Sequence, residues 1–528
     1  MKKHFFRAIS VVLSLCLVVA MAVPAFAALE GDYNTNLPTV YLQGQGSELY
    51  VDKDRGRASG FIHNIEVPDG YIGDEAKKLI KPLAKGLLTD DWSDWVDQFM
   101  ESAAPLFEKQ ALDANGEASN GTGANFSGTG GNKANADGTY QIGAYMPNYD
   151  WRLDPFTIAD QLHAYLAKLT RQTNHETVNL MGRSIGASVV MAYLQRYGTE
   201  YVETVVLYCP SFFGMETVSK AFAGKINISP EGAAAFVRYA LDSGMLAENF
   251  GEENMDTFRT LADFVSTMVS LHALDLPAAA LDRIYGKIYT ELYPRLMVKM
   301  YGSMPSFWSL VGDDDYEQAK KNIFGGQEDV YAGLITKIDN YHYNVMNKTA
   351  DILTGLIENG SKIQIVCKYG VPMIPVVEGA RVESDMLTSV YSASYKATAA
   401  DYGTTLTPDY LKKAEERGAA KFVSPDKRID ASTCLLPDHT WFIRDVAHRS
   451  MPEGINALFE TILNYDGYMT VFDDETAPQY MAYDSETDSL STIEPTDPAP
   501  TGLRAIIARL REFFNRLFSL FVRLLARK

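Results

Sequence analysis

Hydrophobic positions along the chain form two alternating patterns. Short runs of β-branched and aromatic residues, which are typical of buried strands, occur at Thr39–Leu42, 140–146, 177–181, Val202–Tyr208, 362–368 and Thr440–Arg444. Apolar residues spaced three and four apart predict amphipathic helices at 158–169, 187–197 and 455–465. The strand–helix–strand order predicts an α/β fold with a mostly parallel central sheet flanked by helices.

One long stretch, 213–352, interrupts this alternation. It carries helical patterns and scarcely a strand candidate; the clearest helical patterns lie at 233–241, 257–271 and 278–300. A large all-helical insertion between two strands is typical of a cap or lid domain. We therefore expect a core formed by 28–212 and 353–483, with a helical cap at 213–352.

The first 27 residues have the pattern of a secretory signal peptide. Basic residues at the start precede an uncharged apolar run over 8–23, and the run ends in Ala25-Phe26-Ala27. The run is shorter than the roughly 20 residues that cross a bilayer. We expect cleavage after Ala27 and a secreted, extracellular protein.

The opposite end of the chain changes character twice. Residues 484–501 mix acids with prolines and predict an extended acidic linker. Residues 502–528 place an apolar stripe among seven basic residues and one acid, which predicts a basic amphipathic helix. Such a helix suits contact with an anionic membrane or cell surface. A dimerising helix and a helix docked on the acidic body are the alternatives.

Charge and cysteine content indicate which partners and which disulfides this chain can have. The chain has 48 Lys plus Arg against 67 Asp plus Glu, a net charge of -19, so no nucleic-acid partner is expected. Removal of the signal peptide leaves three cysteines: Cys209, Cys367 and Cys434. One disulfide with a spare thiol, or three buried thiols, are both compatible with that count. The sequence contains no clear metal-ligand spacing and no cofactor-binding motif, so we expect neither a metal ion nor a cofactor.

The strongest chemical signal is Gly182-Arg183-Ser184-Ile185-Gly186, between a predicted strand and a predicted helix. A serine held in such a tight turn is exposed as a nucleophile, and flanking glycines let the helix pack closely. The alternative is an ordinary turn serine. If Ser184 is a nucleophile, we expect an oxyanion hole formed by the backbone N–H groups of Ile185 and Gln45. Gln45 lies in the Gly-rich loop after Thr39–Leu42.

A nucleophilic serine needs a histidine as base and an acid to orient that histidine. In this strand–turn–helix context the chain order is serine, acid, histidine. His448 follows the strand Thr440–Arg444, whereas His439 precedes it, so we choose His448. The acid should follow the strand at 362–368, where Glu378, Glu383 and Asp385 are candidates. We choose Asp385, with a helix-capping carboxylate as its alternative.

Together these motifs resemble the α/β-hydrolases, in particular the lipase branch that includes lecithin:cholesterol acyltransferase. The resemblance also uses Asp150, Trp151 and Arg152 before the nucleophile and Trp308 within the cap, and it covers roughly 39–210 and 360–450. It implies substrate-binding roles for these four residues. A local Asp150–Arg152 ion pair with a core Trp151 is the alternative.

Departures limit what the resemblance implies. That branch has His, His and Gly where this chain has Gln43, Arg183 and Met386. Only ester hydrolysis is carried over. The leading hypothesis is a secreted serine hydrolase that cleaves carboxylic esters, with lipid-like acyl chains favoured by the large cap. A non-catalytic surface-binding protein on the same fold and a serine peptidase or amidase are the alternatives.

Overall fold

The computed structural model describes residues 32–62, 91–225, 301–374 and 382–494, apart from positions 46, 109, 129–130 and 486, with scattered helical residues in 78–89 and 235–239. The predicted signal peptide, the predicted tail helix at 502–528 and most of 226–300 lie outside the described residues. Among the described helices, none combines the length and the apolar character that crossing a bilayer requires.

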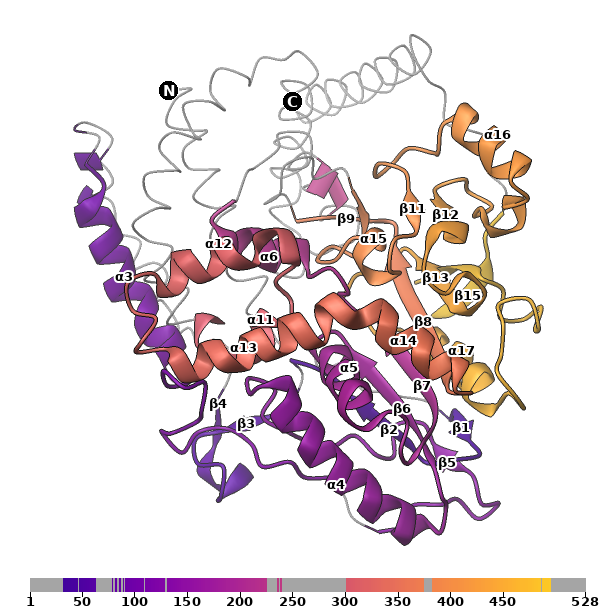
Figure 1. Cartoon of the computed structure of the whole chain (residues 1–528), viewed down its shortest axis with the longest axis horizontal. Helices are drawn as coiled ribbons and strands as arrows, with labels where there is room; N and C mark the ends of the chain where they lie inside the picture. The colour runs from indigo at the N-terminus through magenta and orange to yellow at the C-terminus, as the bar shows by residue number, and fades with distance from the viewer. Residues whose placement is uncertain are drawn as a thin grey trace, which may run out of the picture.

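A seven-stranded sheet runs through the middle of the described molecule (Figure 1). Its spatial order is β15-β14-β13-β8-β7-β6-β2. The strands are β2 (Thr39–Leu42), β6 (Val178–Arg183), β7 (Val202–Tyr208), β8 (Lys362–Tyr369), β13 (Thr440–Arg444), β14 (Tyr480–Asp484) and β15 (Ser489–Thr492). All neighbouring pairs are parallel except β14 and β15. Their carboxyl ends, apart from that of β15, therefore share one edge, which is where open α/β sheets bind ligands.

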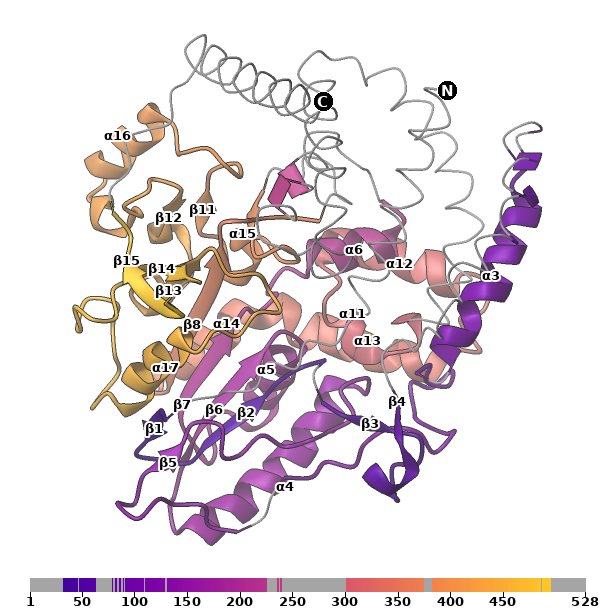
Figure 2. The same ribbon diagram turned by 180° about the vertical axis from the view of Figure 1, so that it is seen from behind.

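Helices cover both faces of this sheet (Figure 2). Side chains of a strand alternate between faces, so two apolar clusters form. One face carries α4 (Pro155–Thr173), α5 (Ile185–Tyr197) and α14 (Thr349–Glu358). The other face carries α17 (Gly454–Asn464). The predicted mostly parallel α/β sheet flanked by helices is thus confirmed.

Helix α4 shows why the predicted helices begin and end where they do. Asp154 precedes it, and the side chain accepts a hydrogen bond from the backbone N–H of Thr157. Pro155 then occupies the first turn, where its missing N–H costs nothing. At the other end Asn174 adopts the left-handed conformation, with φ of 57°. These local signals stop the helix after its apolar face is complete.

The remaining described helices vary in length. They are α3 (Ser93–Glu108), α6 (Glu216–Ala223), α11 (Pro305–Trp308), α12 (Asp313–Phe324), α13 (Ala332–Asn344), α15 (Val390–Ala393) and α16 (Pro408–Glu416). Four of them, α6, α11, α12 and α13, fall in the predicted cap, and α6 packs against α12. Within 213–352, no strand occurs among the described residues. The predicted helices of 257–271 and 278–300 lie outside them.

Short two-stranded ladders decorate the main sheet. They pair β1 (Asn34–Thr35) with β5 (Tyr140–Gln141), β3 (Leu49–Tyr50) with β4 (Phe61–Ile62), β9 (Val371–Pro372) with β10 (Glu383–Ser384), and β11 (Thr398–Ala399) with β12 (Ile429–Asp430). Short 3₁₀ segments occur at Gly56–Ser59, Met346–Lys348, Ala420–Phe422, Ala431–Thr433 and Pro437–His439.

Three sequence predictions need correction. The strand expected at 140–146 is only β5, because the chain turns at 142–143, where Gly143 favours a turn. The linker expected at 484–501 contains β15, a mostly exposed edge strand whose backbone pairing needs no apolar side chains. The cap boundary at 352–353 falls inside α14, which contacts α5 and β8.

Candidate active site

Ser184 occupies a sharp turn between β6 and α5. Its backbone has φ of 54° and ψ of -123°, a conformation that non-glycine residues rarely adopt. A Cβ on Gly186 would lie 2.2 Å from the Leu42 carbonyl oxygen, and one on Gly182 would lie 2.6 Å from the carbonyl oxygen of Gly186. Only glycine fits at these two positions, so the motif makes the turn possible.

The side chains of Ser184, His448 and Asp385 form one hydrogen-bonded chain. His448 Nε2 lies 3.0 Å from Ser184 Oγ, and His448 Nδ1 lies 2.6 Å from Asp385 Oδ2. They arrive from the carboxyl ends of three parallel strands, β6, β8 and β13, although β8 and Asp385 are separated by the β9–β10 ladder. The three residues chosen from the sequence are therefore adjacent in space.

Asp385 is held in its charged form. Burial by itself would raise the pKa of this carboxyl, which is 1% exposed, but the interaction with His448 and a backbone hydrogen bond outweigh it and lower the pKa. Asp385 Oδ1 accepts the N–H groups of Leu387 at 3.1 Å and Thr388 at 2.9 Å. An ionised Asp385 keeps the proton of His448 on Nδ1, so Nε2 can accept from Ser184.

Met386, directly after this acid, has φ of 93°. That value lies in the region that favours glycine, so the side chain is held in a strained backbone conformation. Here the chain keeps a glycine-like turn without the glycine that the resemblance implies.

Lys368 fixes the loop that carries His448. Its ammonium group donates to the carbonyl oxygens of Ala447 at 3.1 Å, His448 at 3.2 Å and Ser450 at 2.6 Å. Burial lowers the pKa of this fully buried lysine to about 8. Lys368 was not among the residues predicted from the sequence, although a lysine inside the apolar run 362–368 is a visible signal.

The loop that contains Gln45 packs against the turn that contains Ser184 and Ile185. Ile185 begins α5, where backbone N–H groups have no acceptor within the helix. Gly44 packs so closely on the turn that a Cβ there would be 3.3 Å from the Ile185 nitrogen and 2.8 Å from the Arg183 carbonyl oxygen. Among the described residues, no acceptor binds the N–H of Ile185 or of Gln45. Both N–H groups are thus available to an oxygen acceptor, as the predicted oxyanion hole requires.

Tyr149 positions the loop that contains Gln45. Its hydroxyl accepts the N–H of Gly44 at 3.0 Å, and the ring is completely buried. The phenol thereby holds the loop that leads to Gln45 against the serine turn. The residues that follow Tyr149 were predicted from the sequence to bind substrate, whereas no role was predicted for Tyr149 itself.

His439 lies at the opposite end of β13. Its ring stacks on Tyr468, with ring centroids 3.7 Å apart, and Nδ1 lies 2.8 Å from the Met469 carbonyl oxygen. Burial lowers the pKa of His439. This packing leaves the His439 side chain half-buried.

Cys209 completes a compact group with Asp385 and His448, whose potential ligand atoms all lie within 4.8 Å of one another. Burial raises the pKa of the Cys209 thiol to about 12, which keeps it protonated and a poor metal ligand at neutral pH. The short His448–Asp385 hydrogen bond already uses the other two groups. Cys209, Cys367 and Cys434 are all free and buried, which resolves the open disulfide question.

The four residues expected to bind substrate lie in the interior. Arg152 and Asp150 form a two-pronged ion pair at 2.8 and 2.7 Å, and Arg152 also donates to the Gln110 carbonyl oxygen. Trp151 is fully buried and contacts Phe307 edge-on. The local ion pair with a core tryptophan is therefore the arrangement observed.

Trp308 likewise belongs to a core rather than to a surface of the site. It is 1% exposed, stacks on Phe324, and meets Phe222 and Tyr316 edge-on. Among the described residues, no hydrogen bond or ring contact joins Trp308 to Ser184 or His448. Its aromatic packing instead ties α6, α11 and α12 together.

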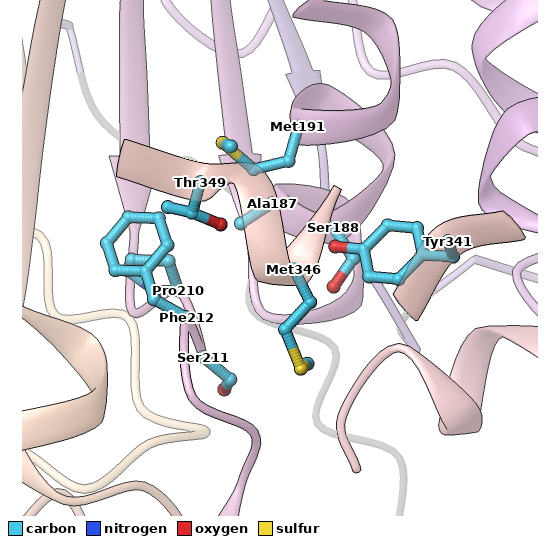
Figure 3. Close-up of a pocket in the computed structure, with 9 residues that line it drawn as sticks. All are labelled: Ala187, Ser188, Met191, Pro210, Ser211, Phe212, Tyr341, Met346 and Thr349. Atoms are coloured by element: carbon cyan, nitrogen blue, oxygen red, sulfur yellow. The ribbon is translucent and has the colours of Figure 1, made fainter. Parts of the chain in front are cut away.

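A small cavity opens beside the first turn of α5 (Figure 3). It has a volume of about 10 Å³, enough for about one water molecule. Its lining combines apolar side chains with hydroxyl groups: Ala187, Ser188, Met191, Pro210, Ser211, Phe212, Tyr341, Met346 and Thr349. The lining comes from α5, from the chain after β7 and from the helical segment before β8, so it lies at the sheet edge that carries Ser184.

Comparison with known proteins adds no relative to this geometry: no protein-family model and no curated protein sequence matches the chain.

Proposed function

We propose that this protein is a secreted serine hydrolase with an α/β-hydrolase fold that cleaves carboxylic esters, preferably with lipid-like acyl chains. The observation that carries the proposal is the continuous hydrogen-bonded chain from Ser184 through His448 to Asp385. Order along the chain and order across the sheet both suit this class, because nucleophile, acid and histidine follow β6, β8 and β13, in the same sequence along the chain and across the sheet.

The first half of the reaction transfers the acyl group to the enzyme. Ser184 passes its hydroxyl proton to His448 Nε2 while Oγ bonds to the ester carbonyl carbon. The N–H groups of Ile185 and Gln45 bind the oxygen that becomes negative. The tetrahedral intermediate then breaks its bond to the alcohol oxygen, and His448 gives that oxygen the proton. An acyl-serine and a free alcohol result.

Water completes the cycle. His448 takes a proton from a water molecule as the water oxygen attacks the acyl-serine carbonyl. The second tetrahedral intermediate releases a carboxylic acid, and His448 returns its proton to Ser184 Oγ. Asp385 stays ionised throughout and stabilises the positive charge that His448 carries in both steps. These steps use the side chains of Ser184, His448 and Asp385, the backbone N–H groups of Ile185 and Gln45, and one water molecule.

The apolar side chains around the cavity beside α5, rather than its volume of about 10 Å³, support an apolar acyl group. Met191, Phe212 and Met346 line it close to the serine turn, next to a helical segment that separates β7 from β8. Apolar side chains around a reacting ester favour a hydrocarbon chain over a polar one. Export is supported by the pattern of residues 1–27. Surface attachment is supported by the apolar stripe and the seven basic residues of 502–528.

Labelling with a fluorophosphonate probe tests whether Ser184 is an activated nucleophile. Covalent labelling of the natural protein, and none of Ser184→Ala, is expected. A protein that uses the fold only for surface binding would stay unlabelled.

A panel of 4-nitrophenyl esters from acetate to palmitate then tests the substrate class. We expect kcat/KM to rise beyond acetate. Strict preference for acetate would contradict the lipid-like acyl chain, and faster cleavage of matched anilides than of esters would favour a peptidase or amidase.

A further inference from the structure

Four hydrogen-bond donors gather under the serine turn without an acceptor. Arg183 is 5% exposed, and its Nε and Nη1 atoms have no hydrogen-bond partner. The hydroxyl groups of Tyr41 and Tyr208 are also buried and without partners. Both tyrosines are completely buried. A buried donor without an acceptor is costly, so such a concentration is uncommon outside a binding site.

The sheet itself brings these donors together. Arg183 of β6 is in register with Tyr208 of β7, and Tyr41 of β2 is in register with Met181, two residues before Arg183. Because side chains alternate along a strand, all three residues face α17. The Tyr41 hydroxyl lies next to Arg183, and the charge and side-chain contact of Arg183 oppose the rise of the Tyr41 pKa that burial causes. The two side chains do not meet the geometry of a regular hydrogen bond, so both keep donors for a further partner.

The charges around this cluster favour an anion. Among the described residues, no carboxylate forms an ion pair with Arg183. A second guanidinium, that of Arg449, has its pKa lowered to about 10 by burial and then by the Arg183 charge. The Lys368 ammonium lies 4.6 Å from the centre of the Tyr208 ring. Asp385 is already engaged by His448, so the cluster lacks a counter-charge of its own.

The two phenols remain donors at neutral pH. Burial raises the pKa of Tyr41, and it raises that of Tyr208 well above the ordinary value. Arg183 offers planar N–H groups in a fork that suits two oxygens of one group. A carboxylate presents about four acceptor positions on two oxygens, which equals the four donors that lack partners.

We propose that Arg183, Tyr41 and Tyr208 form an oxyanion-binding subsite under the nucleophile, and that it receives a carboxylate on the alcohol side of the ester substrate. The assignment of the carboxylate to the alcohol side of an ester rests on the proposed function. Arg183 directly precedes Ser184, and the Ser184 N–H donates to the Tyr208 carbonyl oxygen at 3.2 Å, so the subsite adjoins the reacting serine. The small cavity and the apolar side chains around it lie on the other face of the sheet, toward α5. An ester that joins an apolar acyl group to an anionic alcohol would use both sides.

Anion binding is tested without catalysis, in Ser184→Ala. We expect sodium acetate or sodium phosphate to raise Tm above the value in sodium chloride of equal ionic strength, because a ligand that binds only the folded state stabilises it. Tyr208→Phe removes one donor and keeps the ring, so in this background it should reduce the rise. Equal Tm values in all three salts would overturn the subsite.

The source of the anion is tested with two esters of one shape, 4-butyryloxybenzoate and 4-butyryloxybenzamide. The natural protein should favour the charged ester in kcat/KM by about tenfold or more, the range expected for hydrogen bonds to a charged group. Arg183→Met and Tyr208→Phe should each bring that ratio toward one. Tyr369→Phe is the matched control, because this buried hydroxyl binds Asp426 instead, and it should preserve the ratio.

Each result has a separate meaning. A Tm rise with no preference for the charged ester would overturn the substrate assignment and make a free anion the ligand. Hydrolysis of neither ester would contradict the proposed function, while the Tm comparison in Ser184→Ala would still decide whether the subsite exists.

Discussion

His439 and His448 stand at opposite ends of the same strand, β13. His448 follows the carboxyl end, where Ser184 and Asp385 occupy its two ring nitrogens. His439 precedes the amino end, where it stacks on Tyr468 and binds the Met469 carbonyl oxygen. Both side chains are at least partly buried and both are hydrogen-bonded. Neither burial nor hydrogen bonding therefore separates a chemical role from a structural one here.

Strand direction makes the difference. In a parallel sheet the carboxyl ends of all strands meet at one edge, and loops from that edge can converge on one point. Ser184, Asp385 and His448 converge in this way, and Lys368 then secures the last loop. At the amino edge, the residues before β13 contribute packing contacts, such as the stacking of His439 on Tyr468. The sheet thus has one edge suited to chemistry and one suited to stability.

The largest expected difference in kcat is between the alanine variants of the two histidines. His448→Ala and Ser184→Ala should each lower kcat for short aryl esters by on the order of 10⁶, because each removes a member of a unit that acts together. His439→Ala should lower Tm and change kcat little. Stopped assays with purified, folded variants give the comparison. Similar kcat values for the two histidine variants would contradict the assignment of roles to the two edges.

The acid is expected to have the next largest effect. Asp385→Asn should lower kcat by on the order of 10⁴, because an amide no longer holds His448 in the required tautomer. Asp438→Asn, at the amino edge, is the matched control and should retain most activity. Circular dichroism verifies that both variants fold. Substantial activity in Asp385→Asn would point to another acid as the partner of His448.

Two polar residues of β8 extend the comparison. Lys368→Met frees three carbonyl groups of the His448 loop and should lower kcat by about 10–100-fold through misplacement of the imidazole. Gln364 donates to the Met469 carbonyl oxygen at 3.0 Å, so Gln364→Leu should affect Tm more than kcat. Equal loss of kcat in both variants would show that Lys368 has no special effect on the loop.

Lys368 also predicts a pH dependence. Its pKa is about 8 in the folded chain against an ordinary 10.5, so between these values the unfolded chain binds more protons than the folded one. The free energy of unfolding should therefore rise with pH across that window in the natural protein, relative to Lys368→Met. Urea unfolding at the two ends of the window measures the difference. If the free energy of unfolding of the natural protein, relative to that of Lys368→Met, fell as pH rises, the burial of a lysine with a lowered pKa would be contradicted.

The smallest expected effects concern two glycines. Gly186→Ala, at the carboxyl edge, should destabilise the fold by about 1–3 kcal/mol or more, because its Cβ would lie 2.2 Å from the Leu42 carbonyl oxygen. Gly355 lies inside α14, before the amino end of β8, and nothing surrounds its Cβ position within 4 Å. Gly355→Ala should stabilise the protein by about 0.5–1 kcal/mol. Urea unfolding should give opposite signs.

Much of this fold could be predicted because the core strands are apolar and short. The predicted bounds of β2, β7 and β13 agree with the structure to the residue. β15 escaped prediction because an exposed edge strand is recognised by backbone pairing, which leaves no apolar pattern. The Asp150–Arg152 pair was assigned to substrate by resemblance, although two opposite charges two residues apart can simply satisfy each other.

What the sequence determined by itself is the set of groups and their order: a serine between glycines, an acid after one strand and a histidine after another. Local rules suffice for that, because periodicity, turn residues and strand direction are properties of short segments. Only the tertiary structure decided which groups meet. The contact between Lys368 and the His448 loop, and the donors shared by Arg183, Tyr41 and Tyr208, depend on strands far apart in the chain. No short stretch of sequence contains the distances on which such contacts depend.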